Sequence, residues 1–121
     1  MDDGSDPAVA ELSARGLKDR LDRGEPLAVL DVREDHERAY AAIPVPPTSA
    51  DLHVPLGQVA ARFGEIAAAA GGRPLVVYCH HGIRSEVAAI WLARRGVEEV
   101  HNLGGGIEAW SIRVDPGIPR Y

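Results

Sequence analysis

The fold of this chain is decided by residues 76–85, which read VVYCHHGIRS. The apolar run 75–78 follows a proline and contains β-branched residues, which is typical of a buried strand. The apolar residues at 87–93 are typical of a helix that packs beside that strand. Cys79 is the only cysteine of the chain, and it lies where the predicted strand gives way to a loop.

The loop after Cys79 has the features of an anion-binding site. Gly82 lies near its centre, and a helix follows, so backbone N–H groups can turn inward and the positive end of the helix favours negative charge. Such surroundings favour the thiolate form of cysteine, which is the form that attacks. We therefore expect Cys79 to be a nucleophile. The expected anion-binding loop consists of His80, His81, Gly82, Ile83, Arg84 and Ser85.

Other interpretations of these residues stay open at the level of sequence. A single buried cysteine at a strand end is often a small hydrophobic residue without chemistry. Arg84 could form a surface salt bridge, and Ser85 is expected mainly to cap the helix, with a hydrogen bond to the anion as the alternative. His80 and His81 are expected on the outer rim, because a loop whose amides face inward turns its side chains outward. No second Cys or His pair has the spacing of a metal site, so we expect no metal.

Three segments together resemble the rhodanese-like family. The loop reads Cys-x-x-Gly-x-Arg-Ser, residues 96–110 read GVEEVHNLGGGIEAW, and residues 30–34 read LDVRE. The resemblance covers nearly the whole chain and implies sulfur transfer, because loops of this length go with sulfur and longer ones with phosphate or arsenate. It also implies that Asp31 and Arg33 support the catalytic loop. The residues alone are explained as well by a structural ion pair, and we favour that explanation for Arg33.

Length and composition indicate one compact domain. The chain has 121 residues, of which 45% are hydrophobic, and we expect a disordered lead at 1–7 and a single domain at 8–121. The formal charge of -5 provides no basic field for nucleic acid or an anionic membrane. No apolar run approaches the roughly 20 residues of a membrane span. One cysteine cannot form an internal disulfide, so we expect a cytoplasmic protein.

Strands alternate with helices along the chain, which predicts a parallel sheet covered on both faces. We expect a three-layer α/β/α sandwich around a mainly parallel sheet of about four to five strands. Residues 44–55 are rich in proline and are expected to form an extended loop. The glycine triplet 104–106 is expected to turn the chain sharply into the last helix. The expected strands are 9–12, 27–30, 75–78 and 97–102, and the expected helices are 14–23 with Ser13 as its N-cap, 34–40, 56–70, 87–93 and 107–110.

The length of the loop indicates which anion fits. Four residues separate Cys79 from Arg84, one fewer than in cysteine-dependent phosphatases, so the loop should hold a persulfide sulfur more readily than a phosphoryl group. We expect a sulfurtransferase that moves a sulfane sulfur from thiosulfate or another persulfide donor to cyanide, a thiol or a protein, through a persulfide on Cys79 and without a cofactor. A sulfur-carrier module serving an adenylating enzyme is the alternative, because residues 115–121 are similar to tails found there. A cysteine-dependent phosphatase is the third possibility.

Overall fold

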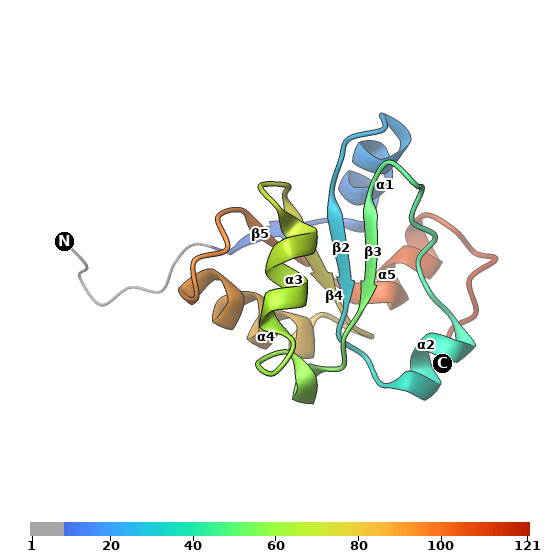
Figure 1. Ribbon diagram of the computed structural model, residues 1–121. Coiled ribbons are helices and arrows are strands. Elements are labelled where there is room, and N and C mark those ends of the chain that lie inside the picture. Colours follow the sequence, from blue (N-terminus) through green and yellow to red (C-terminus); the bar gives the residue numbers. More distant parts are fainter. Residues whose placement is uncertain (1–8) are drawn as a thin grey trace.

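The computed structural model describes residues 9–121, so the disordered lead expected at 1–7 lies outside the described residues. Within that range one sheet contains five parallel strands in the order β1-β5-β4-β2-β3 (Figure 1). The central strand is β4, which has a neighbour on each side, and Cys79 follows its last residue. The strands are β1 (Ala10–Leu12), β2 (Ala28–Asp31), β3 (Ala50–His53), β4 (Leu75–Tyr78) and β5 (Val100–Leu103).

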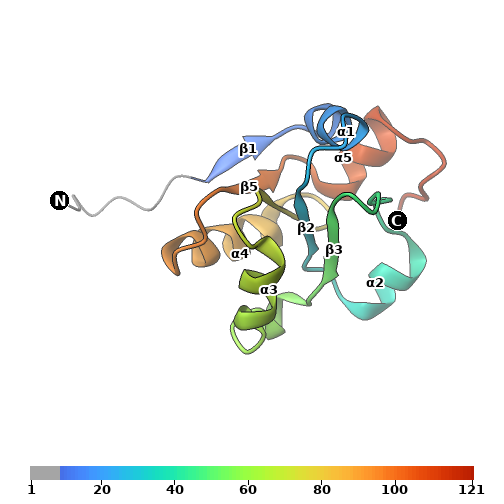
Figure 2. The ribbon, with the colours of Figure 1, turned by 45° about the horizontal axis from the view of Figure 1, so that its top comes forward.

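Helices cover both faces of the sheet, as Figures 1 and 2 show from two directions. One face is covered by α1 (Ala14–Asp22) and α5 (Gly106–Arg113), and the other by α3 (Phe63–Ala70) and α4 (Ile83–Arg94). The short α2 (Asp35–Tyr40) lies beside the end of the chain at residue 121. The predicted three-layer α/β/α sandwich with a parallel sheet is confirmed.

The central strands are apolar along their whole length because both faces of the sheet are covered. All four residues of β4 are buried, and they alternate between two hydrophobic cores. Leu75 and Val77 belong to the core under α3 and α4, whereas Val76 and Tyr78 belong to the core under α1 and α5. An uninterrupted apolar run is therefore the pattern to expect here, and it was the signal by which this strand could be predicted.

Local signals predicted some helix ends correctly. Ser13 is the N-cap of α1, and its hydroxyl accepts a hydrogen bond from the N–H of Gly16 at 2.9 Å. The expected helix at 56–70 is in fact two elements, a 3-10 helix η1 (Leu56–Gln58) and then α3 from Phe63. The helix expected at 87–93 is present as part of α4, which begins earlier than expected, at Ile83.

The loop expected at 44–55 contains a strand, so that prediction is wrong in part. Residues 50–53 form β3, which pairs in parallel with β2. The N–H of Ala50 donates to the carbonyl of Leu27 at 2.9 Å, and Ser49 Oγ accepts from the N–H of Leu27 at 3.0 Å. The prolines flank these residues and none lies within them, so they remove no donor from the ladder.

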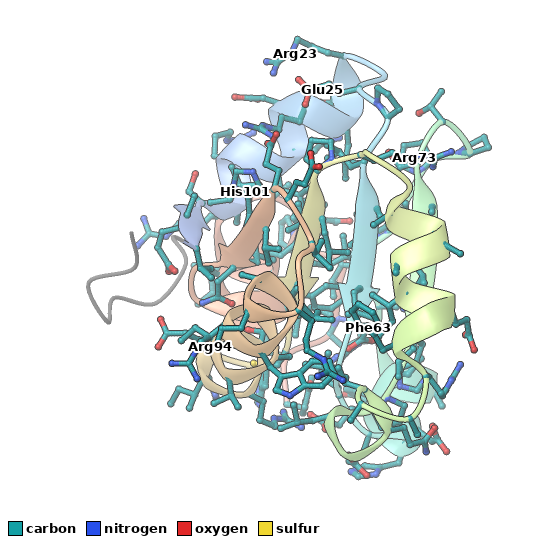
Figure 3. The ribbon with its side chains drawn as sticks, turned by 60° about the vertical axis from the view of Figure 1, so that its left-hand side comes forward. Arg23, Glu25, Phe63, Arg73, Arg94 and His101 are labelled. Atoms are coloured by element: carbon teal, nitrogen blue, oxygen red, sulfur yellow. The ribbon has the colours of Figure 1, made fainter. Side chains whose placement is uncertain are left out.

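The two ends of the sheet differ in character. Figure 3 shows Arg23, Glu25 and Arg73 at the amino end, before β2 and β4 begin. Cys79 lies at the opposite, carboxyl end, where ligands of open α/β sheets usually bind.

Among residues 9–121, no helix has the length and hydrophobicity needed to span a membrane.

Candidate functional site

Cys79 is buried, yet its sulfur faces polar groups. The residue is 1% exposed, and Sγ accepts hydrogen bonds from the N–H groups of Gly82 at 3.1 Å and Ser85 at 3.4 Å. The hydroxyl oxygen of Ser85 lies 3.3 Å from Sγ. Donors directed at the sulfur stabilise negative charge on it, which an inert thiol in an apolar core would not need.

The remaining amides of the loop are free to bind an anion. Gly82 is the N-cap of α4 in a left-handed conformation with φ 102°, so the helix begins directly at Ile83 and its positive end faces the loop. A set of backbone N–H groups here has no acceptor within the range 9–121. They belong to His80, His81, Ile83 and Arg84.

The loop keeps this shape because α5 binds its carbonyl groups from behind. The N–H of Ile107 donates to the carbonyl of Cys79 at 2.9 Å, and the N–H of Glu108 donates to that of His80 at 3.1 Å. Gly106 allows this approach: a Cβ there would lie 2.5 Å from the Cys79 oxygen and closer still to that of His80. The N–H groups of His80 and His81 belong to the same peptide units as these two carbonyls, so they point the opposite way, away from α5.

Asn102 on β5 links the loop to the sheet, and sequence reasoning did not single it out. This residue is 2% exposed, and its Oδ1 accepts a hydrogen bond from the Ser85 hydroxyl at 2.6 Å. Its Nδ2 donates to the carbonyl of Gly82 at 3.1 Å and to Glu11 Oε2 at 3.2 Å. The prediction that Ser85 caps α4 is wrong, because Gly82 occupies the N-cap and the Ser85 side chain is turned toward Asn102. A polar residue at the end of a predicted buried strand was the available signal.

Arg84, at the end of the loop, forms a salt bridge with Glu37 of α2. Its Nη1 and Nη2 atoms donate to the two carboxylate oxygens of Glu37 at 2.7 and 2.9 Å. Glu37 is 8% exposed, and the bonds from Arg84 hold the pKa of its carboxyl well below the usual range. A salt bridge was the alternative role considered for Arg84, although this one is partly buried. Its action on a bound anion remains a prediction.

Asp31 and Arg33 form a buried ion pair beside the loop. Both side chains are fully buried, and two hydrogen bonds of 2.9 and 2.8 Å join the Arg33 guanidinium to the Asp31 carboxylate. Arg33 also donates to the carbonyl of Ala41 at 2.6 Å and to the Tyr121 hydroxyl at 2.9 Å. This is the structural ion pair that the sequence led us to favour for Arg33. The pair is connected to the cysteine-containing loop indirectly, because Tyr121 in turn donates to Glu37 at 2.8 Å, and Glu37 is paired with Arg84.

The histidines of the loop differ in their surroundings. The ring of His80 stacks on Tyr121, with centroids 3.8 Å apart, and on His81 at 3.9 Å. Burial, and then the charge of His81, lower the pKa of His80. His81 is exposed as expected, and Ile83 is exposed as well, whereas His80 is half-buried against Tyr121 and not on the outer rim as expected. The described residues contain no cluster of three or more His, Cys, Asp or Glu side chains that could hold a metal ion.

These features define a class of protein: a parallel α/β domain whose central strand ends in a cysteine-containing loop at a helix N-terminus. The family model of the rhodanese-like domain matches residues 13–113. The chain belongs to the rhodanese-like domain family, as the motifs indicated.

Known proteins with similar sequences and structures agree with this assignment. The chain is 34% identical over 103 residues to a sulfurtransferase of Allochromatium vinosum, and the matched region covers 85% of this chain and 89% of that protein. It is 33% identical over 119 residues to the adenylyltransferase and sulfurtransferase MOCS3-1 of Zea mays, covering 95% of this chain and 24% of that protein. The chain therefore spans about a quarter of the length of the maize relative. A rhodanese-like domain protein from Staphylococcus aureus shares the fold, with a TM-score of 0.72, 23% identity, and coverage of 93% of this chain and 99% of that one.

Proposed function

We propose that this chain is a sulfurtransferase that carries a sulfane sulfur as a persulfide on Cys79. The observation that carries the proposal is the position of Sγ, which accepts two backbone N–H groups at the start of α4 while the other loop amides remain available. A persulfide is an anion whose outer sulfur is stabilised by nearby donors, and the backbone N–H groups of this loop are donors of that kind.

The reaction has two half-reactions. In the first, the Cys79 thiolate attacks the outer sulfur of thiosulfate, a bond forms between Sγ and that sulfur, and the electron pair of the broken S–S bond leaves with sulfite. The loop amides stabilise the developing charge, and Arg84 closes the loop with its salt bridge to Glu37. In the second half-reaction cyanide, a thiol or a protein thiol takes the outer sulfur and restores the thiolate. No step requires a metal or an organic cofactor.

Intact-protein mass spectrometry tests the proposal directly. Incubation with thiosulfate should add the mass of one sulfur atom, and cyanide should remove it as thiocyanate. Cys79→Ser should show no addition, and since Cys79 is the only cysteine of the chain the assignment needs no peptide mapping. An unchanged wild-type mass at saturating concentrations of thiosulfate and of other sulfane donors would contradict the proposal.

A second candidate is a sulfur-carrier module that serves an adenylating enzyme. It is favoured by the similarity to the maize protein, whose name joins an adenylyltransferase to a sulfurtransferase and of which this chain spans 24%. A carrier would load with sulfur but release it to cyanide slowly, whereas an independent enzyme would turn over many times.

The third possibility, a cysteine-dependent phosphatase, has its own test. Hydrolysis of an aryl phosphate by the wild type that is lost in Cys79→Ser would favour it.

A further inference from the structure

We propose that Glu37 sets the charge preference of the site, so that the loop takes singly charged sulfane donors in preference to doubly charged ones. The inference rests on the proposed function and specifies the class of donor. It concerns Glu37 as a positioning residue that acts through Arg84.

Arg84 is the cation of the catalytic loop, and its two terminal nitrogens are already paired with a carboxylate. Both terminal nitrogens donate to Glu37, at 2.7 and 2.9 Å, in the two-pronged geometry by which arginine also binds anionic ligands. A second anion could bind both terminal nitrogens of Arg84 in this geometry only if the Glu37 carboxylate dissociated from them. A donor that enters the loop therefore meets a neutral ion pair at this position and not an unpaired positive charge.

Glu37 is held firmly, so its release is costly. Its carboxylate accepts four hydrogen bonds: two from Arg84, one from the Tyr121 hydroxyl at 2.8 Å and one from the N–H of Glu34 at 3.0 Å. Tyr121 is fixed in turn, because its hydroxyl accepts from Arg33 at 2.9 Å and its ring stacks on His80.

The charge that remains for the anion comes from the backbone. The N-terminus of a helix is equivalent to roughly half a positive charge, and the loop amides add their dipoles. Across the loop, Glu108 of α5 is likewise paired, with Arg120 at 2.6 Å. Such a site compensates one negative charge well, whereas a second negative charge is left close to the Glu37 carboxylate. A monoanion is therefore the better-matched ligand.

Thiosulfate and methanethiosulfonate form a matched pair of probes. Both carry the same terminal sulfane sulfur, but a methyl group in methanethiosulfonate replaces one charged oxygen, so its charge is one unit smaller. The Cys79 thiolate attacks the terminal sulfur of either donor and the S–S bond breaks. The electron pair leaves as sulfite from thiosulfate and as methanesulfinate from methanethiosulfonate, and the persulfide on Cys79 is the same in both reactions.

The measurement is the ratio of kcat/KM for thiosulfate to kcat/KM for methanethiosulfonate, with cyanide as acceptor. The two donors differ in intrinsic reactivity, but this difference cancels when the ratio of a variant is compared with that of wild type. In Glu37→Gln the paired negative charge is lost and Arg84 is left uncompensated, so the ratio should rise about tenfold. Tyr121→Phe keeps the ring stacked on His80 but removes one donor from Glu37, so the ratio should rise about two- to threefold.

Two exposed positions provide matched controls. Glu65→Gln removes a carboxylate from the Arg62–Glu65 pair on α3, and Tyr40→Phe removes the hydroxyl of a tyrosine on α2 that is 57% exposed. Both should leave the ratio within twofold of wild type. A ratio that rises in Glu37→Gln and Tyr121→Phe but in neither control supports the proposal, and if Glu37→Gln fails to fold, Tyr121→Phe still carries the test.

An unchanged ratio in variants that still load sulfur would overturn this inference and leave the proposed function intact. A wild-type chain that accepts sulfur from neither donor would overturn both. A merely structural role for Glu37 would lower kcat/KM for both donors by the same factor and leave the ratio where it was, which also counts against the proposal.

Discussion

Gly106 is the position at which a single methyl group should disturb the site most. A Cβ at this residue would lie 2.5 Å from the carbonyl oxygen of Cys79, which is backbone and cannot rotate away. The residue also has a φ of 60°, in the left-handed region that only glycine adopts readily. Gly106→Ala must therefore shift α5, the catalytic loop or both.

The cost follows from these two effects. A left-handed conformation costs a residue with a Cβ about 1 to 2 kcal/mol, and overpacking costs about 1 to 3 kcal/mol, so the unfolding free energy should fall by about 2 to 5 kcal/mol. For a chain of this size, each kcal/mol corresponds to roughly 4 °C in melting temperature. We expect Gly106→Ala to melt about 8 to 20 °C lower than wild type. Its rate of sulfur loading from thiosulfate should fall at least about tenfold, because the N–H groups of Ile107 and Glu108 no longer hold the loop carbonyls in place.

Gly64→Ala is the control. Gly64 is the second residue of α3, and a Cβ there would meet no atom within 4 Å apart from its chain neighbours and the backbone of its own helix. Alanine is favoured over glycine within a helix by about 0.5 to 1 kcal/mol, so this variant should melt slightly higher than wild type and load sulfur at the wild-type rate. The reasoning is refuted if Gly106→Ala keeps the wild-type melting temperature and loading rate, since the contact between α5 and the loop would then not be as close as described.

Three further predictions concern the groups around the loop. Asn102→Leu leaves the buried Ser85 hydroxyl without its acceptor, so the unfolding free energy measured in urea should fall by about 1 to 3 kcal/mol. The rate at which iodoacetamide alkylates Cys79 should also change. An alkylation rate equal to that of wild type would contradict the role of Asn102 in holding the loop. Asp31→Asn removes the negative charge that faces the buried guanidinium of Arg33 and should cost about 3 to 5 kcal/mol, again measured in urea, whereas a loss below about 1 kcal/mol would show that the pair is dispensable. The pKa of Glu37 is lower in the folded chain than its ordinary value of 4.5, so its contribution to stability is complete above that pH and is lost as the pH falls toward the folded pKa. Wild type should therefore lose more stability than Glu37→Gln between about pH 5 and pH 2, and parallel curves for the two proteins would refute the assignment.

The sequence indicated the reactive end of the sheet because its signals are local. An apolar run, a cysteine and a glycine at fixed spacing describe β4 and the loop that follows it without reference to any distant residue. The cap of α1 at Ser13 is also a local signal, and so are the apolar patterns of the strands and helices whose alternation along the chain predicts the parallel sheet. Periodicity and turn chemistry are properties of short segments, and these elements are determined largely by them.

The groups that hold the loop could not be predicted, because they come from distant parts of the chain. Glu37 and Arg84 are 47 residues apart, and Asn102 and Glu11 are 91 apart. No periodic pattern indicates that two such residues will meet.

The wrong prediction of Ser85 as the N-cap of α4 has a different cause. Serine is the commoner N-cap, but the left-handed Gly82 starts α4 three residues earlier and leaves Ser85 inside the helix.

The loop residues 79–85 have few stabilising contacts of their own. The carbonyls of Cys79 and His80 are held by α5, the carbonyl of Gly82 and the Ser85 hydroxyl by Asn102, and Arg84 by a carboxylate that Tyr121 also binds. An engineer who grafted only these seven residues onto another scaffold would transfer the chemical groups without the framework that orients them. A successful transplant would need the last strand and helix, α2 and the tail as well, so the smallest portable unit is close to the entire fold.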